Sequence, residues 1–211
     1  MIDNLFDLKK RYYLVTGAGG LLGREHCKAI SSANGIPVAI DLEIDCLSKL
    51  QKELLEKYQI EMPIHSCSVT SLTQLEKLKV KLNSTGIFIS GIINNAAINP
   101  NVGNKGLESL GRLETYDINQ WDLELDVSLK GSYLVVRTFS KDLLSHNHSG
   151  VIVNISSDLG IIAPDQRLYR KKGIADNKQS VKPITYSVTK AGLIGMSKYF
   201  STYFNTYIKV S

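Results

Sequence analysis

The stretch Thr16-Gly17-Ala18-Gly19-Gly20-Leu21-Leu22-Gly23 follows an apolar strand-like run at 12–15 and precedes a helix-like segment that extends through Ile30. Glycines in a turn between a strand and a helix let the backbone approach a pyrophosphate, and the helix N-terminus offers N–H groups to the anion. The next predicted strand, 36–40, ends at Asp41, whose carboxylate can accept a hydrogen bond from a ribose. Because strand, helix and acid all stand in the expected places, these features predict a dinucleotide site rather than a plain structural turn.

The composition indicates one domain over residues 1–211. The chain is 43% hydrophobic and has 25 basic and 20 acidic residues, for a net charge of +5. These charges are interspersed, which is typical of a solvated surface and not of a nucleic-acid interface. No apolar run is long enough to span a bilayer, no secretory leader pattern opens the sequence, and three cysteines do not make a disulfide framework. We therefore expect a cytoplasmic protein with no membrane and no nucleic-acid partner.

Short apolar runs alternate with helix-like stretches, which predicts an α/β fold. The runs lie near 12–16, 36–40, 62–67, 87–93 and 151–155. This alternation is typical of a Rossmann-like, doubly wound parallel sheet in three α/β/α layers. A capping box of Ser71 and Gln74 predicts a helix start. Two further helices are expected over 119–144 and 184–206, and the apolar stripe of the first one, from Trp121 to Val136, is assigned to core and subunit interface.

Two stretches interrupt this rhythm, 99–115 and 164–183. Both should emerge at the carboxyl ends of strands, where open α/β sheets bind ligands, so we expect them to line the substrate site. The second stretch is basic, although its charges are more typical of solvated side chains than of an anion clamp. These charges are Arg167, Arg170, Lys171, Lys172, Lys178 and Lys182.

Tyr186 and Lys190 are four residues apart and therefore share one face of a helix. A neighbouring ammonium group favours the phenolate, so the tyrosine can act as a general base for an alcohol or a general acid for a carbonyl. The motif alone is weak, but it follows the predicted strand 151–155, whose carboxyl end presents Ser157. A hydroxyl there can hydrogen-bond the reacting oxygen while a cofactor carries the hydride.

In these motifs the sequence resembles the classical branch of the short-chain dehydrogenase/reductase family over nearly its whole length. Asn94-Asn95-Ala96-Ala97 is similar to the motif at the end of the fourth strand in that family, although Asn94 can equally satisfy backbone groups. The resemblance implies that Tyr186 is the acid/base, that Lys190 assists it and binds the nicotinamide ribose, and that Ser157 positions the substrate oxygen. The cofactor-binding residues that it implies are Gly17, Gly20, Leu21, Leu22, Gly23, Asp41, Ser68, Val69, Asn95, Ala96, Ala97, Tyr186 and Lys190.

The cofactor is expected to be NAD. No arginine or lysine closely follows Asp41, so a 2′-phosphate would meet only negative charge and NADP is less favoured. The histidines His65, His146 and His148 show no metal-ligand spacing, so no metal site is expected.

The sequence also departs from the family pattern. Leu21 stands where the classical branch has glycine, and the glycines at 17, 20 and 23 instead resemble the extended branch, which includes nucleotide-sugar epimerases. Ser128 replaces an asparagine that supports a proton-relay water, so it is a fourth catalytic candidate. Ser68 replaces an aspartate that meets the adenine amino group. Ser157 and Tyr186 are also further apart than in typical members.

The leading hypothesis is an NAD-dependent oxidoreductase that interconverts a secondary alcohol and a ketone on a small polar substrate such as a sugar. The alternatives are a nucleotide-sugar epimerase or dehydratase, and a truncated, catalytically silent dinucleotide-binding protein. The resemblance implies a homodimer through helices 119–144 and 184–206. It also implies that 207–211 is the first half of a sixth strand, so that the usual C-terminal strand and substrate lid are absent from this sequence.

Overall fold

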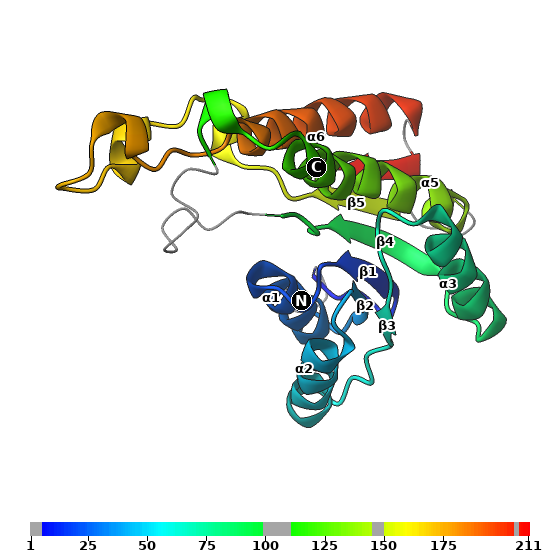
Figure 1. The fold of residues 1–211 in the computed structure, drawn as a ribbon. Helices are drawn as coiled ribbons and strands as arrows, with labels where there is room; N and C mark the ends of the chain where they lie inside the picture. The colour runs from blue at the N-terminus through cyan, green and yellow to red at the C-terminus, as the bar shows by residue number, and fades with distance from the viewer. Residues whose placement is uncertain (1–5, 99–110, 145–149, 205–206) are drawn as a thin grey trace.

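The computed structural model describes residues 6–98, 111–144, 150–204 and 207–211. Six parallel strands form a sheet in the order β3-β2-β1-β4-β5-β6, so the chain winds outward from β1 and then returns to build the other half (Figure 1). The predicted doubly wound α/β fold is confirmed. The strands are β1 Tyr12–Thr16, β2 Ile36–Asp41, β3 Ile64–Ser66, β4 Ile89–Asn94, β5 Gly150–Asn154 and β6 Ile208–Val210.

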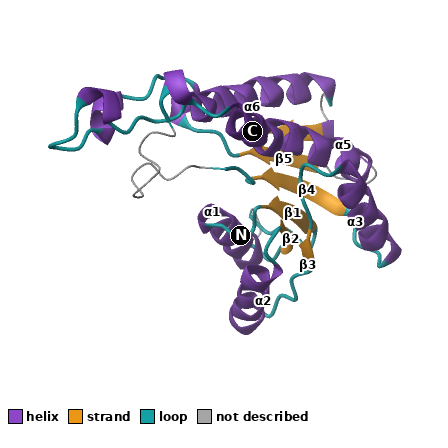
Figure 2. Ribbon diagram, viewed as in Figure 1, coloured by secondary structure: helices purple, strands orange, loops and turns teal. Residues whose placement is uncertain are grey.

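Helices cover both faces of the sheet, as Figure 2 shows. The first two pack on one face, and the third, fifth and sixth pack on the other. These helices are α1 Leu21–Ser32, α2 Ile44–Tyr58, α3 Leu72–Ser84, α4 Ile118–Leu125, α5 Gly131–Leu144 and α6 Ile184–Tyr203. Short helical turns lie at Leu113–Thr115 (η1), Asp126–Lys130 (η2), Asp158–Gly160 (η3), Gln166–Tyr169 (η4) and Asp176–Lys178 (η5).

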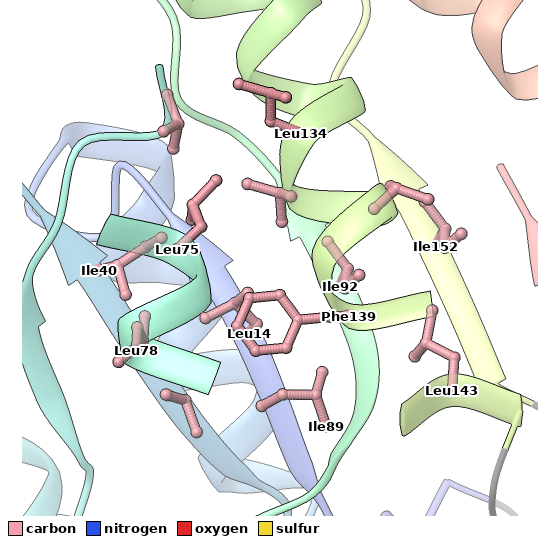
Figure 3. Close-up of a cluster of buried hydrophobic side chains, with 14 of the residues drawn as sticks. Leu14, Ile40, Leu75, Leu78, Ile89, Ile92, Leu134, Phe139, Leu143 and Ile152 are labelled. Atoms are coloured by element: carbon pink, nitrogen blue, oxygen red, sulfur yellow. The ribbon is translucent and has the colours of Figure 1, made fainter. Parts of the chain in front are cut away.

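The strands are apolar at successive positions because both of their faces are buried. Leu14 of β1 belongs to the core cluster under α3, α5 and α6, whereas its neighbour Val15 belongs to the cluster under α1 and α2. Both side chains are fully buried. In Figure 3, Phe139 of α5 lies among Leu14 and Ile92 of the sheet. This two-sided burial fixes the sheet between its two helical layers.

The start of α3 follows the expected capping box only in part. Ser71 Oγ accepts a hydrogen bond from Gln74 N at 3.3 Å, as predicted. The Gln74 side chain, however, accepts from Ser68 N at 2.8 Å and does not return to the capping residue. It thereby ties the helix start to the loop after β3.

The helix expected over 119–144 is present as three consecutive parts. The middle part, Asp126–Lys130, is a π-helical turn that joins α4 to α5. Such a turn adds a residue and rotates the buried face, which here passes through Ser128 and Ser132. Of the stripe predicted to serve as core and subunit interface, one member lies in the core, and the interface part stays a prediction. Val136 is buried, whereas Trp121, Leu125 and Leu129 are only partly covered and Tyr133 is exposed.

The C-terminal part agrees closely with expectation. The last helix begins at Ile184 as predicted and ends at Tyr203, and β6 pairs with β5. Residues 99–110 of the glycine-containing stretch, together with His146 and His148, lie outside the described residues. None of the described helices is long and apolar enough to cross a membrane.

Candidate active site

A cavity of about 550 Å³ lies at the carboxyl edge of the sheet, between the loops after β1 and β4. This is the point where the strand order reverses, which is where open α/β sheets bind ligands. The loops after β2, β3 and β5 and the first turns of α6 complete its wall. The predicted residues that line it are Gly17, Gly20, Leu21, Leu22, Asp41, Ser68, Val69, Asn95, Ala96, Ala97, Tyr186 and Lys190.

At Gly17 and Gly23 the glycine loop is packed too tightly against backbone atoms for a side chain. Gly17 has a φ of +61°, and a Cβ there would lie 2.9 Å from Ala96 Cα. A Cβ at Gly23 would lie 2.1 Å from the Gly17 carbonyl oxygen, so the absence of a side chain there lets α1 pack on the loop. Gly23 is the one predicted cofactor residue that does not line the cavity. Gly20 is the N-cap of α1 and has no side chain to occupy the first-turn N–H groups. These groups are thus available to an anion.

Asp41 joins the end of β2 to the glycine loop. Its Oδ2 accepts from Gly19 N at 2.9 Å and its Oδ1 accepts from Leu42 N at 2.7 Å. A carboxylate has about four acceptor positions, so capacity remains for further donors such as ribose hydroxyls.

Asn95 fixes the shape of the glycine loop from the end of β4. Its Nδ2 donates to the carbonyl oxygens of Thr16 and Gly17, both at 3.0 Å. In return, Thr16 Oγ1 accepts from Asn95 N at 3.0 Å and Ala96 N at 2.9 Å. These hydrogen bonds give Asn95 a structural role at the cavity wall, with Thr16 as its partner.

Asn94 has a structural role, which was one of the two roles considered for it from the sequence. Its Nδ2 donates to Asn154 Oδ1 at 2.8 Å, and Asn154 Nδ2 donates to Ser197 Oγ at the same distance. These two hydrogen bonds link β4, β5 and α6 below the cavity.

On the other wall, Ser68 Oγ and Thr70 Oγ1 share a hydrogen bond of 2.9 Å.

Tyr186 and Lys190 meet at the α6 side of the cavity. Lys190 is buried, and its Nζ donates to the Ile155 carbonyl oxygen at 2.7 Å. The same nitrogen lies 5.7 Å from the centroid of the Tyr186 ring. Burial, together with the charge of Lys182, lowers the pKa of Lys190. An ammonium group and a phenol are thus held side by side at the wall of a ligand-sized cavity.

The two serine candidates do not line this cavity. Ser157 caps η3, where its Oγ donates to Asp158 Oδ1 at 2.8 Å and accepts from Leu159 N at 3.2 Å. Ser128 is buried in the π-helical turn, and its carbonyl oxygen accepts from Ser132 Oγ at 2.7 Å. Because η3 packs against α6, Ser157 lies on an element next to Tyr186, but its hydroxyl is held by the neighbouring carboxylate.

The basic stretch 164–183 does not line this cavity, and its expected place at the substrate site stays a prediction. It projects beyond the carboxyl edge of the sheet (Figure 1). Arg167 pairs with Asp165 at 2.8 Å and Arg170 pairs with Asp176 at 3.3 Å, so part of its positive charge is used within the loop.

Sequence reasoning missed the apolar part of the cavity wall, which comes from Leu42, Cys67, Ile98, Leu123, Val127 and Ile155. No motif marks these positions, because they meet only through the strand order. It also missed two charged residues beside the first turn of α6. Lys182 was treated as one of six loop cations, and Glu124 was hidden within a predicted amphipathic helix.

Comparison with known proteins identifies relatives of this chain. A family model for short chain dehydrogenases matches residues 11–169. An uncharacterized oxidoreductase of Saccharomyces cerevisiae is 25% identical over 194 residues, which are 92% of this chain and 52% of that protein. An NAD-dependent glycerol dehydrogenase of Listeria innocua is 20% identical over 93% of this chain and 65% of that protein. The chain therefore spans half to two thirds of the length of these two relatives.

Among solved structures, a gluconate 5-dehydrogenase from Burkholderia cenocepacia in complex with NADP and tartrate has the same fold. The TM-score is 0.81 at 18% identity, and the match covers 100% of this chain and 72% of that one.

Proposed function

The chain belongs to the short-chain dehydrogenase family, and from this premise we propose that it is an NAD-dependent oxidoreductase that interconverts a secondary alcohol and a ketone. The observation that carries the proposal is the meeting of the glycine loop, Asp41, Tyr186 and Lys190 around one cavity. A dinucleotide site and an acid/base pair at one cavity are what alcohol oxidation requires.

The residues present fit a dinucleotide. The absence of side chains at Gly17 and Gly20 lets the backbone approach a pyrophosphate, and the open N-terminus of α1 would stabilise its charge. Asp41 would hold the adenosine ribose and Lys190 the nicotinamide ribose. When bound, the nicotinamide supplies the hydride acceptor or donor.

The protein supplies the proton chemistry. Tyr186 would take the proton from the substrate hydroxyl in oxidation and return it in reduction. Lys190 would favour the negatively charged tyrosine, because its ammonium group is fixed nearby by the Ile155 carbonyl. Ser157 would contact the substrate oxygen after its hydroxyl turns from Asp158.

The preference for NAD rests on Asp41. Its carboxylate would repel a 2′-phosphate, which disfavours NADP. The named relatives include both an NAD-dependent enzyme and an NADP complex, so this residue and not the family supports the choice.

A small polar substrate such as a sugar or polyol is the second part of the proposal. The glycerol and gluconate enzymes among its relatives act on compounds of this kind. A homodimer through residues 119–144 and 184–206 is supported by exposed aromatic side chains along α6, where Tyr199 and Tyr203 are 62% and 68% exposed.

The test is a turnover assay with purified protein, NAD or NADP, and a panel of polyols and sugars. Growth of the reduced-nicotinamide absorbance, faster with NAD, would support the proposal. An epimerase or dehydratase would instead convert a nucleotide sugar without releasing free NADH, a possibility that the glycine spacing raises. NADH binding without turnover on any substrate would indicate a silent binding protein.

A further inference from the structure

Lys182 places a second ammonium group at Tyr186. Its Nζ lies over the tyrosine ring, 3.7 Å from the centroid, which is closer than Lys190 Nζ at 5.7 Å. A cation in this position is attracted to the negative face of the ring. Lys182 itself does not line the cofactor cavity. It contacts the ring of Tyr186, which does line that cavity.

The backbone of Lys182 is fixed by one side chain. Gln166 Oε1 accepts from Lys182 N at 2.8 Å, and Gln166 Nε2 donates to the Lys182 carbonyl oxygen at 3.3 Å. This two-way contact spans the basic stretch and closes it just before α6. The position of Lys182 is therefore set by the folded loop and does not depend on a freely rotating surface segment.

A buried carboxylate holds the start of α6 beside this lysine. Glu124 of α4 accepts from Tyr116 Oη at 2.9 Å, from Gln120 Nε2 at 2.7 Å and from Thr185 Oγ1. Thr185 directly precedes Tyr186. The negative charge of Glu124 also opposes the effect of burial, which lowers the pKa of Lys182.

The other charged groups near Tyr186 are engaged elsewhere. On η3, Asp158 accepts from Ser157, and in the π-helical turn Asp126 and Lys130 pair with each other at 2.6 Å. Lys190 bonds the Ile155 carbonyl. Two ammonium groups thus lie near the phenol ring, and the buried Glu124 carboxylate has three hydrogen-bond donors of its own.

We propose that Lys182 is a positioning residue for Tyr186, which holds the ring by a cation–π contact and stabilises the negative charge that develops when the phenol gives up its proton. Glu124 supports it by fixing the first turn of α6. The inference rests on the proposed function, because it assigns Lys182 a part in the proton transfer by Tyr186. The proposal gives a role to Lys182 alone among the six basic residues of the stretch 164–183.

The experiment compares Lys182→Met, Lys182→Arg and a control, Lys49→Met, which removes an exposed charge on α2. NADH affinity is measured by fluorescence titration, and kcat and KM for alcohol oxidation are measured as a function of pH. For Lys182→Met we expect unchanged NADH affinity, KM within about twofold, and kcat lower by about tenfold, with half-maximal oxidation shifted to higher pH. Lys182→Arg should restore most of kcat, since a guanidinium group also stacks on a ring. Lys49→Met should match the wild type.

An unchanged kcat and pH profile in Lys182→Met would overturn the inference. So would equal losses in Lys182→Met and Lys182→Arg, which would indicate a packing role. If the wild type binds NADH but turns over no substrate, the proposed function fails, and the role of Lys182 is then tested by tyrosinate absorbance. The signal of Tyr186, obtained by subtracting the Tyr186→Phe spectrum, should appear at higher pH in Lys182→Met; an identical midpoint would refute the inference.

Discussion

Replacement of Gly23 by alanine tests the packing of α1 on the glycine loop. The added Cβ would lie 2.1 Å from the Gly17 carbonyl oxygen and 2.7 Å from Ala18 Cα, whereas real Cβ contacts are essentially never under 3.0 Å. Both neighbours are backbone atoms, so the loop must move by roughly 1 Å. Overpacking of this kind lowers the free energy of unfolding by about 1–3 kcal/mol. The better helix propensity of alanine offsets at most about 1 kcal/mol of this loss. We expect the free energy of unfolding to fall by about 1–2 kcal/mol.

The same movement displaces Gly17, which lines the cavity, so NADH affinity should fall by about tenfold or more. Urea unfolding and fluorescence titration with NADH measure the two effects. The control is Gly195→Ala in α6, where no atom lies within 4 Å of the added Cβ. It should raise the stability by up to about 1 kcal/mol and leave NADH affinity unchanged. Wild-type stability and affinity in Gly23→Ala would refute this description of the loop.

Three further changes address other parts of the site. Asp41→Ala removes the acceptor of Gly19 N and a negative charge, so the affinities for NADH and NADPH measured by titration should converge; an unchanged ratio would contradict the assigned role. Burial lowers the pKa of Lys190 below its usual value of 10.5, so just below pH 10.5 the folded state binds fewer protons than the unfolded state. Wild-type stability should therefore rise relative to Lys190→Met as pH approaches 10.5 in urea unfolding series, and parallel pH profiles would argue against this burial. Asn94→Ala removes the donor to Asn154 and should cost about 1–3 kcal/mol of unfolding free energy, so a cost near zero would count against this hydrogen bond.

The fold could be predicted because burial on both faces makes parallel strands apolar at successive positions. Leu14 and Val15 point into different core clusters, yet both are apolar, and this pattern recurs in every long strand. The cavity wall from the glycine loop to Asp41 was predictable for a related reason, since turn and acid lie close together in sequence and are placed by one βαβ unit.

The remaining features depend on backbone and side-chain geometry that the hydrophobic pattern does not encode. The π-helical turn at Asp126–Lys130 rotates the buried face of the helix, and hydrophobic periodicity alone does not reveal it. The Ser157 hydroxyl donates to Asp158, and this contact depends on the side-chain rotamers of the two residues. The position of Lys182 over Tyr186 depends on a contact with Gln166 across the basic loop.

The central claim is that Tyr186 performs the proton transfer at a cavity that holds the dinucleotide. Its most direct test is a paired measurement on Tyr186→Phe, of NADH affinity and of substrate-dependent formation of reduced nicotinamide. We expect NADH affinity within about twofold of the wild type, because the lost hydroxyl is one group in a large site, and turnover lower by about 10²-fold or more. Full turnover by Tyr186→Phe would show that another group transfers the proton.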